Sequence, residues 1–396
     1  MTTMLDVAPH SADALLPIYR RMPLDVVRGE GVRLFDADGR SYLDFTSGIA
    51  VNALGYGDAG LADVMRDALG SGLIHVSNLF GTDPARALAA ALVARSFASS
   101  VFFCNSGAEA NEGAFKFARR WSRSHNGVGA TEIVALRGSF HGRLFASLAA
   151  TDRPGYRAPF RPLAGGVTIV ERDLPGLETL LSTGTVAAVI AEPVQGEGGV
   201  RVLSTEFLQE LRRLTRKYGA ALILDEVQCG LGRTGALFAH EHAGIEPDMM
   251  TLAKPLAGGL PMGAILMTAD IASAIEPGDH ATTFGGGPFV ASVANYVVGR
   301  LSDPALLAHV RDQGAWIGDR LASLVSANAK VRAARGIGFI WGIDVTDAAS
   351  TVVRAALDAG LLVCSAGDHT VRLLPPLVAS RAELAEGLDL LEDALK

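Results

Sequence analysis

Two charged side chains that follow apolar, strand-like runs could together do amine chemistry. Lys254 is one of only five lysines beside 30 arginines, and it ends the run Met249–Ala253 just before a Pro/Gly-rich turn. Burial at that point would lower the pKa of its ammonium group and free a nucleophilic amine. The alternative for this residue alone is a strand-end lysine whose ammonium reaches water.

The second charged side chain is Asp225, which ends the buried-looking run ALILD. A carboxylate there is unfavourable unless a cation or a hydrogen-bonded ring nitrogen accompanies it. The protonated pyridine nitrogen of pyridoxal phosphate would meet that need, and this cofactor requires such a partner to act as an electron sink. The alternative is a structural acid bonded to backbone or to an arginine.

A third feature suits a phosphate. VFFCNSGAEANE predicts a strand followed by a helix whose N-cap is Ser106, with Glu109 three residues later in capping-box spacing. The free N–H groups of such a helix start, with Gly107 allowing close approach, form an anion site. A plain helix cap is the alternative, because such caps are widespread.

The elements that would position these residues are short apolar runs without period-2 alternation. Continuous apolarity is typical of strands buried on both faces, which favours a parallel sheet covered by helices. Ligands of such sheets bind beyond the C-terminal ends of the strands. The predicted strands are Val101–Phe103, Ile133–Leu136, Ala187–Ala191, Ala221–Leu224 and Met249–Ala253, and Ala110–Trp121 reads as an amphipathic helix.

Both ends of the chain read differently from this middle. VRLFDADGRSYLDF predicts a hairpin turning at Asp38-Gly39, and RGIGFIWGIDV to VRLLPPL predicts a late β/turn section. We therefore predict an α/β protein with a large, mainly parallel sheet domain over residues 65–287. A smaller α+β domain would be built from residues 1–64 and 288–396.

Composition excludes several classes of protein. The net charge is −7 with a pI of 5.7 and no basic block, which argues against nucleic-acid partners. No apolar run is long enough to span a membrane, and the stretch from Met1 to Met22 lacks the pattern of a secretory signal. Three distant cysteines indicate a reducing compartment, so we expect a cytoplasmic protein. We expect no metal site, since His240-Glu241-His242 lacks ligand spacing and reads as solvated helix.

Six motifs in order, between about Pro23 and Glu386, resemble the class III (ω-amino acid) aminotransferases of pyridoxal phosphate fold type I, and among them the acetylornithine-type enzymes. The motifs are FTSGIAVNALG, NSGAEANE, SFHGR, EPVQGEGG, LDEVQCGLGRTG and AKPLAGGLPMGA, followed by TTFGGGP and RLLPPL.

The resemblance implies roles for individual residues. Lys254 would bind pyridoxal phosphate covalently and then move a proton, while Asp225 would pair with the ring nitrogen. Thr283 would complete the phosphate site of a neighbouring subunit, which implies a homodimer with shared active sites. The other implied cofactor contacts are Ser106, Gly107 and Ala108 at the phosphate, Phe140 and Val227 on the ring faces, and Gln228 at the ring hydroxyl.

The resemblance also implies two substrates, N-acetylornithine and 2-oxoglutarate, the second leaving as glutamate. Glu197 would mask Arg372 with the first and release it for glutamate, while Arg143 would hold the distal carboxylate of either. For both arginines, the residues alone favour surface ion pairing. Related reactions on ornithine, succinylornithine, succinyldiaminopimelate or 4-aminobutyrate stay open, as does an aminomutase or racemase.

Some positions depart from many relatives of this type. Pro255 and Ala257 stand where glycines are common, Gly287 where asparagine is common, and Tyr56 and Asp58 where histidines are common. We expect Pro255 to stiffen the turn after Lys254 without blocking catalysis. We expect Tyr56 and Asp58 to lie near the substrate entrance, where they would bear on specificity.

Overall fold

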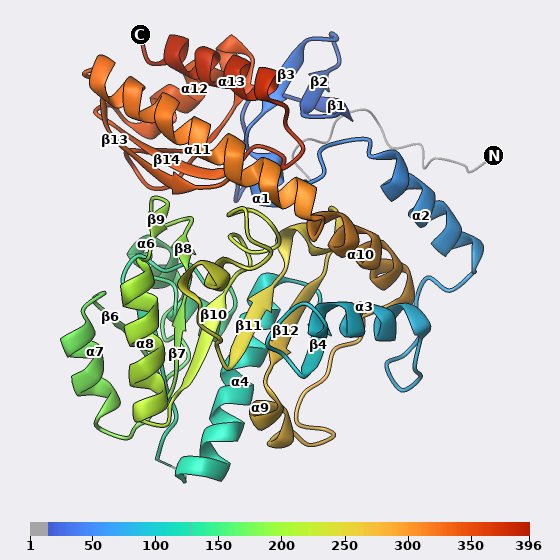
Figure 1. Ribbon diagram of the computed structural model, residues 1–396, viewed down its shortest axis with the longest axis vertical. Helices are drawn as coiled ribbons and strands as arrows, with labels where there is room; N and C mark the ends of the chain where they lie inside the picture. The colour runs from blue at the N-terminus through green and yellow to red at the C-terminus, as the bar shows by residue number, and fades with distance from the viewer. Residues whose placement is uncertain (1–14, 128) are drawn as a thin grey trace.

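The computed structural model describes residues 15–127 and 129–396 (Figure 1). Most of the N-terminal stretch in which we predict no secretory signal lies outside the described residues. Within the described part of the chain, no helix combines the length and the apolar character needed to cross a bilayer.

The residues predicted to do chemistry lie at the C-terminal ends of the strands of the central sheet. Every predicted strand is present, and the sheet is parallel except at β12, which pairs antiparallel with both of its neighbours. In the described chain its spatial order is β4 (Ser100–Cys104), β12 (Gly263–Met267), β11 (Met249–Leu252), β10 (Ala221–Asp225), β7 (Val186–Ala191), β5 (Glu132–Leu136) and β6 (Val167–Val170).

Helices cover both faces of this sheet, which explains the unbroken apolar runs. In β10, Ile223 packs into a cluster with α4 (Gly107–Asn126), whereas Leu222 and Leu224 pack with α7 (Leu174–Leu181) and α8 (Thr205–Lys217). Successive strand residues point to opposite faces, so both faces must be apolar when both are covered. The helix predicted over Ala110–Trp121 is the middle of α4.

The strands of residues 26–44 lie beside the C-terminal segment of the chain, above this layer (Figure 1). The predicted hairpin is β2 (Arg33–Asp36) and β3 (Ser41–Asp44), flanked by β1 (Val26–Glu30). On its other side β3 pairs in parallel with β15 (Leu361–Leu362). The predicted boundaries at residues 64 and 287 stay a prediction.

A second four-stranded sheet carries the late β section. Its order is β13 (Val331–Ile337), β14 (Ile340–Val345), β17 (Thr370–Leu373) and β16 (Cys364–Ser365), all antiparallel. A two-stranded pair joins β8 (Val194–Gln195) to β9 (Arg201–Val202). The remaining helices of eight or more residues are α2 (Ala59–Gly70), α3 (Asp83–Val93), α10 (Pro288–Leu301), α11 (Pro304–Ala327), α12 (Ala349–Ala359) and α13 (Arg381–Ala394).

Short helical turns make up the rest of the described helical structure, and several of them border the ends of the central strands. They are α1 (Ser47–Ala50), α5 (Phe145–Ala149), α6 (Pro154–Arg157), η2 (Ala158–Phe160), η3 (Ala239–Ala243), η4 (Lys254–Ala257) and α9 (Ala269–Ser273).

Candidate active site

A cavity of about 400 Å³ opens where the parallel strands end, a size usual for small-molecule sites. Its walls come from the segments that follow β4, β5, β7, β10 and β11. Ten of the twelve predicted site residues line it: Ser106, Gly107, Ala108, Phe140, Arg143, Glu197, Asp225, Val227, Gln228 and Lys254.

Lys254 is the first residue of η4 and follows the end of β11 by two residues, where the sequence predicts a Pro/Gly turn after the apolar run. Part of its surface faces the cavity, but protein surrounds most of the side chain. This desolvation, followed by the charge of Arg372, lowers the pKa of Lys254 to about 8. Lys254 also has φ near +20°, a conformation that is unfavourable for a residue with a side chain.

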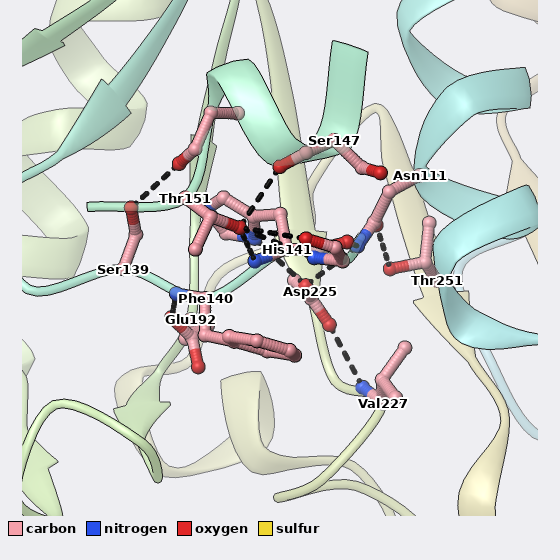
Figure 2. Close-up of polar contacts among 12 residues, drawn as sticks. Asn111, Ser139, Phe140, His141, Ser147, Thr151, Glu192, Asp225, Val227 and Thr251 are labelled. Atoms are coloured by element: carbon pink, nitrogen blue, oxygen red, sulfur yellow. Dashed lines mark hydrogen bonds and ion pairs between the residues drawn. The ribbon is translucent and has the colours of Figure 1, made fainter. Parts of the chain in front are cut away.

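Asp225 ends β10 and is almost fully buried, yet its carboxylate is well bonded (Figure 2). Asn111 Nδ2 and His141 Nδ1 both donate to Oδ2, each at 2.8 Å. The backbone N–H of Val227 donates to Oδ1 at 3.1 Å. Thr251 Oγ1 in turn donates to Asn111 Oδ1 at 2.8 Å, which fixes the asparagine amide. Oδ2 therefore has two donors, and Oδ1 is the oxygen with room for a further donor.

The start of α4 forms the predicted anion site with one difference. Ser106 caps the helix, and its side chain accepts from the N–H of Glu109 at 3.2 Å. Glu109 does not close the predicted capping box on Ser106; instead its carboxylate accepts from the N–H of Asn105 at 2.6 Å. The N–H groups of Gly107 and Ala108, at the first helical positions, have no intrahelical acceptor, so they are available to an anion.

Glu197 and Arg372 form an ion pair of 2.7 Å at the edge of the cavity. Arg372 is 1% exposed. The prediction from the residues alone, that it forms an ion pair at the surface, is therefore wrong. Burial by itself would raise the pKa of Glu197, but the positive charges of Arg372 and Lys254 lower it instead. The paired glutamate therefore stays an anion over the neutral pH range.

Arg143 differs from Arg372 because it is exposed at the cavity mouth. Its guanidinium lies over the ring of Tyr156, with 3.5 Å from Cζ to the ring centroid. Such stacking fixes the plane of the group and leaves its N–H edges available. Tyr156 is thus a neighbour of the site that the sequence analysis did not identify.

Thr283 does not line this cavity. It lines a separate hollow of about 760 Å³ together with His75, Asn78 and His280. Within one chain the structure does not bring Thr283 to Lys254. Its predicted role in a neighbouring subunit stays a prediction.

Comparison with known proteins assigns the arrangement to a family. The model of the aminotransferase class-III family matches residues 17–395. The chain belongs to the class III aminotransferases. It is 46% identical to mitochondrial acetylornithine aminotransferase of Alnus glutinosa, over 98% of this chain and 87% of that one. It is 43% identical to acetylornithine aminotransferase of Neisseria meningitidis serogroup B, over 96% of each chain.

Solved structures of this family share the fold. The crystal structure of N-acetylornithine aminotransferase from Stenotrophomonas maltophilia has a TM-score of 0.83 and 36% identity, covering 95% of this chain and 96% of that one. Ornithine aminotransferase from Toxoplasma gondii has a TM-score of 0.93 and 27% identity, covering 97% and 93%. The predicted α/β fold of pyridoxal phosphate fold type I is confirmed, and the protein is a pyridoxal phosphate-dependent aminotransferase.

The side chains present fit the cofactor of a class III aminotransferase. Asp225 offers a buried anion whose Oδ1 can accept from a ring N–H, and the start of α4 offers N–H donors for a phosphate. His141 adds to this, because its Nε2 is buried with no partner among the described residues. A carboxylate oxygen accepts, so His141 donates to Asp225 through Nδ1 and its Nε2 is the ring nitrogen left without a partner.

Several residues around Asp225 were given no role from sequence. Asn111, Thr251 and Glu192 join the network around Asp225, with the carboxylate of Glu192 accepting from the N–H of Phe140 at 2.9 Å. Burial, and then the charge of Asp225, raises the pKa of Glu192 well above its usual value. Glu192 directly follows a predicted strand, and this position is a sequence signal for a site residue. Asn111 and Thr251 lie inside a predicted helix and a predicted strand, where no sequence signal marks them as site residues.

One further expectation about a single residue was wrong, and those about Tyr56 and Asp58 stay predictions. His240 is not solvated: it is 5% exposed, and its Nδ1 lies 2.8 Å from Glu226 Oε1. Asp58 does not line the cavity but caps α2, accepting from Tyr296 and Arg300. Tyr56 also lies outside the cavity wall and donates to Asp44, so a place near the substrate entrance stays a prediction for both residues. Among the described residues no cluster of His, Cys, Asp or Glu could hold a metal ion.

Replacing Gly107 by alanine is expected to weaken cofactor binding at least tenfold. A Cβ on Gly107 would lie 2.7 Å from Cγ1 of Val227, which also lines the cavity. The overlap would displace either the helix start or Val227. Equilibrium titration of the apoenzyme with pyridoxal phosphate measures the change. Gly299→Ala is the matched control, because nothing lies within 4 Å of its added Cβ, and equal effects in both variants would refute the prediction.

The pKa of Lys254 predicts how cofactor loading depends on pH. The neutral amine is the nucleophile, so the second-order rate of cofactor incorporation into apoenzyme should rise with pH and level off near 8. At pH 7 only about a tenth of the amine is neutral. Stopped-flow absorbance across the pH range tests this, and a rate still rising towards 10.5, the value of an exposed lysine, would contradict it.

Proposed function

We propose that the protein transfers the terminal amino group of N-acetylornithine to 2-oxoglutarate, giving N-acetylglutamate 5-semialdehyde and glutamate, a step of arginine biosynthesis. The names of relatives at 42–46% identity support this substrate. The structural observation that carries it is the Glu197–Arg372 pair beside Lys254. A cavity with a maskable arginine can accept both a plain amine and an amino acid.

Bound pyridoxal phosphate would supply an electron sink for the carbon that carries the amine. We assign Lys254 to attach the cofactor and to move a proton to and from that carbon, since it faces the cavity and its pKa is about 8. Asp225 would keep the ring nitrogen protonated. Gly107 and Ala108 would hold the phosphate, Phe140 and Val227 would cover the ring, and Gln228 would donate to its hydroxyl.

The two substrates differ at the carbon that reacts. In N-acetylornithine that carbon bears no carboxylate, so Arg372 would face it uncompensated unless Glu197 pairs with the guanidinium. In glutamate a carboxylate adjoins the reacting carbon and could replace Glu197 on Arg372 by bidentate binding. Arg143, at the cavity mouth, would hold the distal carboxylate of either substrate.

Steady-state turnover with 2-oxoglutarate and each of four amines tests the proposal: acetylornithine, ornithine, succinylornithine and 4-aminobutyrate. We expect the highest kcat/KM with acetylornithine. Ornithine is the informative competitor, because ornithine aminotransferases are among the solved structures with high TM-scores. A higher kcat/KM with any other amine would reject the proposed donor while leaving the aminotransferase assignment intact.

We also propose that the active protein is a homodimer in which Thr283 completes the partner's phosphate site. Supporting this, large apolar side chains near Thr283 are exposed in the single chain, including Leu79 at 89% and Phe284 at 66%. Exposed apolar clusters of this kind mark interaction sites. Sedimentation of the holoenzyme as a monomer would reject the dimer.

A cytoplasmic location is a further proposal. It is supported by Cys104, Cys229 and Cys364, which are unpaired cysteines in the described chain. Unpaired thiols are usual where the surroundings are reducing. Fractionation of the source cells, with the enzyme followed by its activity, tests the location.

A further inference from the structure

Three side chains contact the guanidinium of Arg372, and they do so at two different nitrogens. Glu197 Oε1 lies 2.7 Å from Nη1, and Gln228 Oε1 accepts from Nη1 at 3.0 Å. Cys364 Sγ accepts from Nε at 3.4 Å. Nη1 is therefore shared by two acceptors, whereas among the described residues Cys364 is the side-chain partner of Nε.

The register of the sheet accounts for the contact between Cys364 and Arg372. β16 and β17 are antiparallel, and Cys364 is directly opposite Arg372. Directly opposed residues project to the same face of a sheet, so their side chains meet. The Cys364 thiol also donates to the backbone oxygen of Arg372 at 3.8 Å, which keeps a sulfur lone pair towards Nε. Ser365, the next residue of β16, projects to the opposite face and is exposed.

The contact between Cys364 and Arg372 matters most when Glu197 no longer pairs with Arg372. With an amine substrate, Glu197 and Gln228 hold Nη1 and Cys364 holds Nε. With glutamate, Glu197 must release Nη1 for the incoming carboxylate. Gln228 then fixes one nitrogen and Cys364 the other. A guanidinium held at two nitrogens keeps its plane, which bidentate binding of a carboxylate requires.

We propose that Cys364 is a positioning residue for the dicarboxylate half of the reaction, holding Nε of Arg372 so that the guanidinium stays oriented after Glu197 departs. The proposal rests on the function proposed above. It assigns to Cys364 an effect on glutamate and 2-oxoglutarate, and not on the amine donor.

The test compares the two half-reactions of the holoenzyme in single-turnover experiments, following the cofactor's absorbance. Cys364→Ala should raise the apparent dissociation constant for glutamate about three- to tenfold, which is the net effect expected for one ordinary hydrogen bond, since sulfur is a weak acceptor. For acetylornithine the change should stay below about twofold. Cys364→Ser restores an acceptor and should recover most of the glutamate affinity. Ser365→Ala is the matched control and should change neither constant.

A binding measurement without turnover accompanies these kinetics. Glutarate has both carboxylates of glutamate but no amine, so it cannot react. Calorimetric titration of the holoenzyme should show weaker glutarate binding in Cys364→Ala by the same factor. Cys364→Val fills the volume of the thiol without providing an acceptor, so it should weaken glutarate binding as Cys364→Ala does. If the alanine variant does not fold, the valine variant is used for the test.

Equal changes in both half-reactions, or no change in either, would overturn the proposal and leave Cys364 as a packing residue. Failure of Cys364→Ser to recover glutamate affinity would do the same. The proposed donor is judged separately, by turnover of the wild-type enzyme. If another amine is the better donor, the same comparison is made with that amine.

Discussion

Replacing Lys254 by alanine is expected to lower kcat by at least about 10⁴-fold, because one side chain supplies both the nucleophile and the base. The variant should fold and should lose the visible absorbance of the lysine-bound cofactor. Its stability should not fall, because no hydrogen bond or ion pair of Nζ is found among the described residues. Removing a desolvated cation of this kind breaks no pair.

Stopped-flow measurement with acetylornithine gives the rate, and thermal unfolding gives the stability. Lys330→Ala is the matched control, since Lys330 is exposed before β13 and contacts the backbone oxygen of Lys396. Turnover of Lys254→Ala within about tenfold of wild type would refute the role of Lys254. An unfolded variant would show instead that the lysine is structural.

Replacing Asp225 by asparagine is expected to slow proton removal from the substrate by two or more orders of magnitude, each decade being about 1.36 kcal/mol of barrier. The neighbouring hydrogen-bond donors determine the orientation of the new side-chain amide. Asn111 and His141 both donate to the Oδ2 position, so the amide oxygen must occupy it. The NH₂ group then takes the Oδ1 position, where it would donate to the ring nitrogen and favour the unprotonated ring.

Primary deuterium isotope effects on the acetylornithine half-reaction measure this step directly. Asp389→Asn, which alters an exposed carboxylate on α13, is the matched control and should leave the rate unchanged. A loss below about tenfold in Asp225→Asn would count against a role for the carboxylate at the ring nitrogen. Cofactor affinity should also fall, since a charged hydrogen bond is lost.

The sheet and most of the cavity could be predicted because both depend on local pattern. Residues such as Ile223 and Leu224 must be apolar on both faces of β10, and such runs are visible in sequence. Once parallel strands are predicted, their C-terminal ends must meet, which places Asp225 and Lys254 together. The remaining site residues were carried over by resemblance.

What could not be predicted depends on distant partners. β12 runs antiparallel because the chain turns back through η4 and a glycine-rich turn, with no helix to carry it across the sheet. His240 is buried because Glu226, 14 residues earlier, accepts from it. Asp58 serves α2 and not the cavity because Tyr296 and Arg300 reach it from α10. No local pattern carries these contacts.

The parallel pairing of β3 with β15 has a consequence for how the polypeptide is made. The hairpin of residues 33–44 emerges from the ribosome early, but its neighbouring strand, Leu361–Leu362, emerges more than 300 residues later. The partner that Glu197 needs, Arg372, comes later still. During translation the central layers can assemble first, whereas the exposed edge of β3 must wait, and such delayed long-range pairing is slow and vulnerable to aggregation. A nascent chain truncated before residue 361 would therefore be a natural client for chaperones.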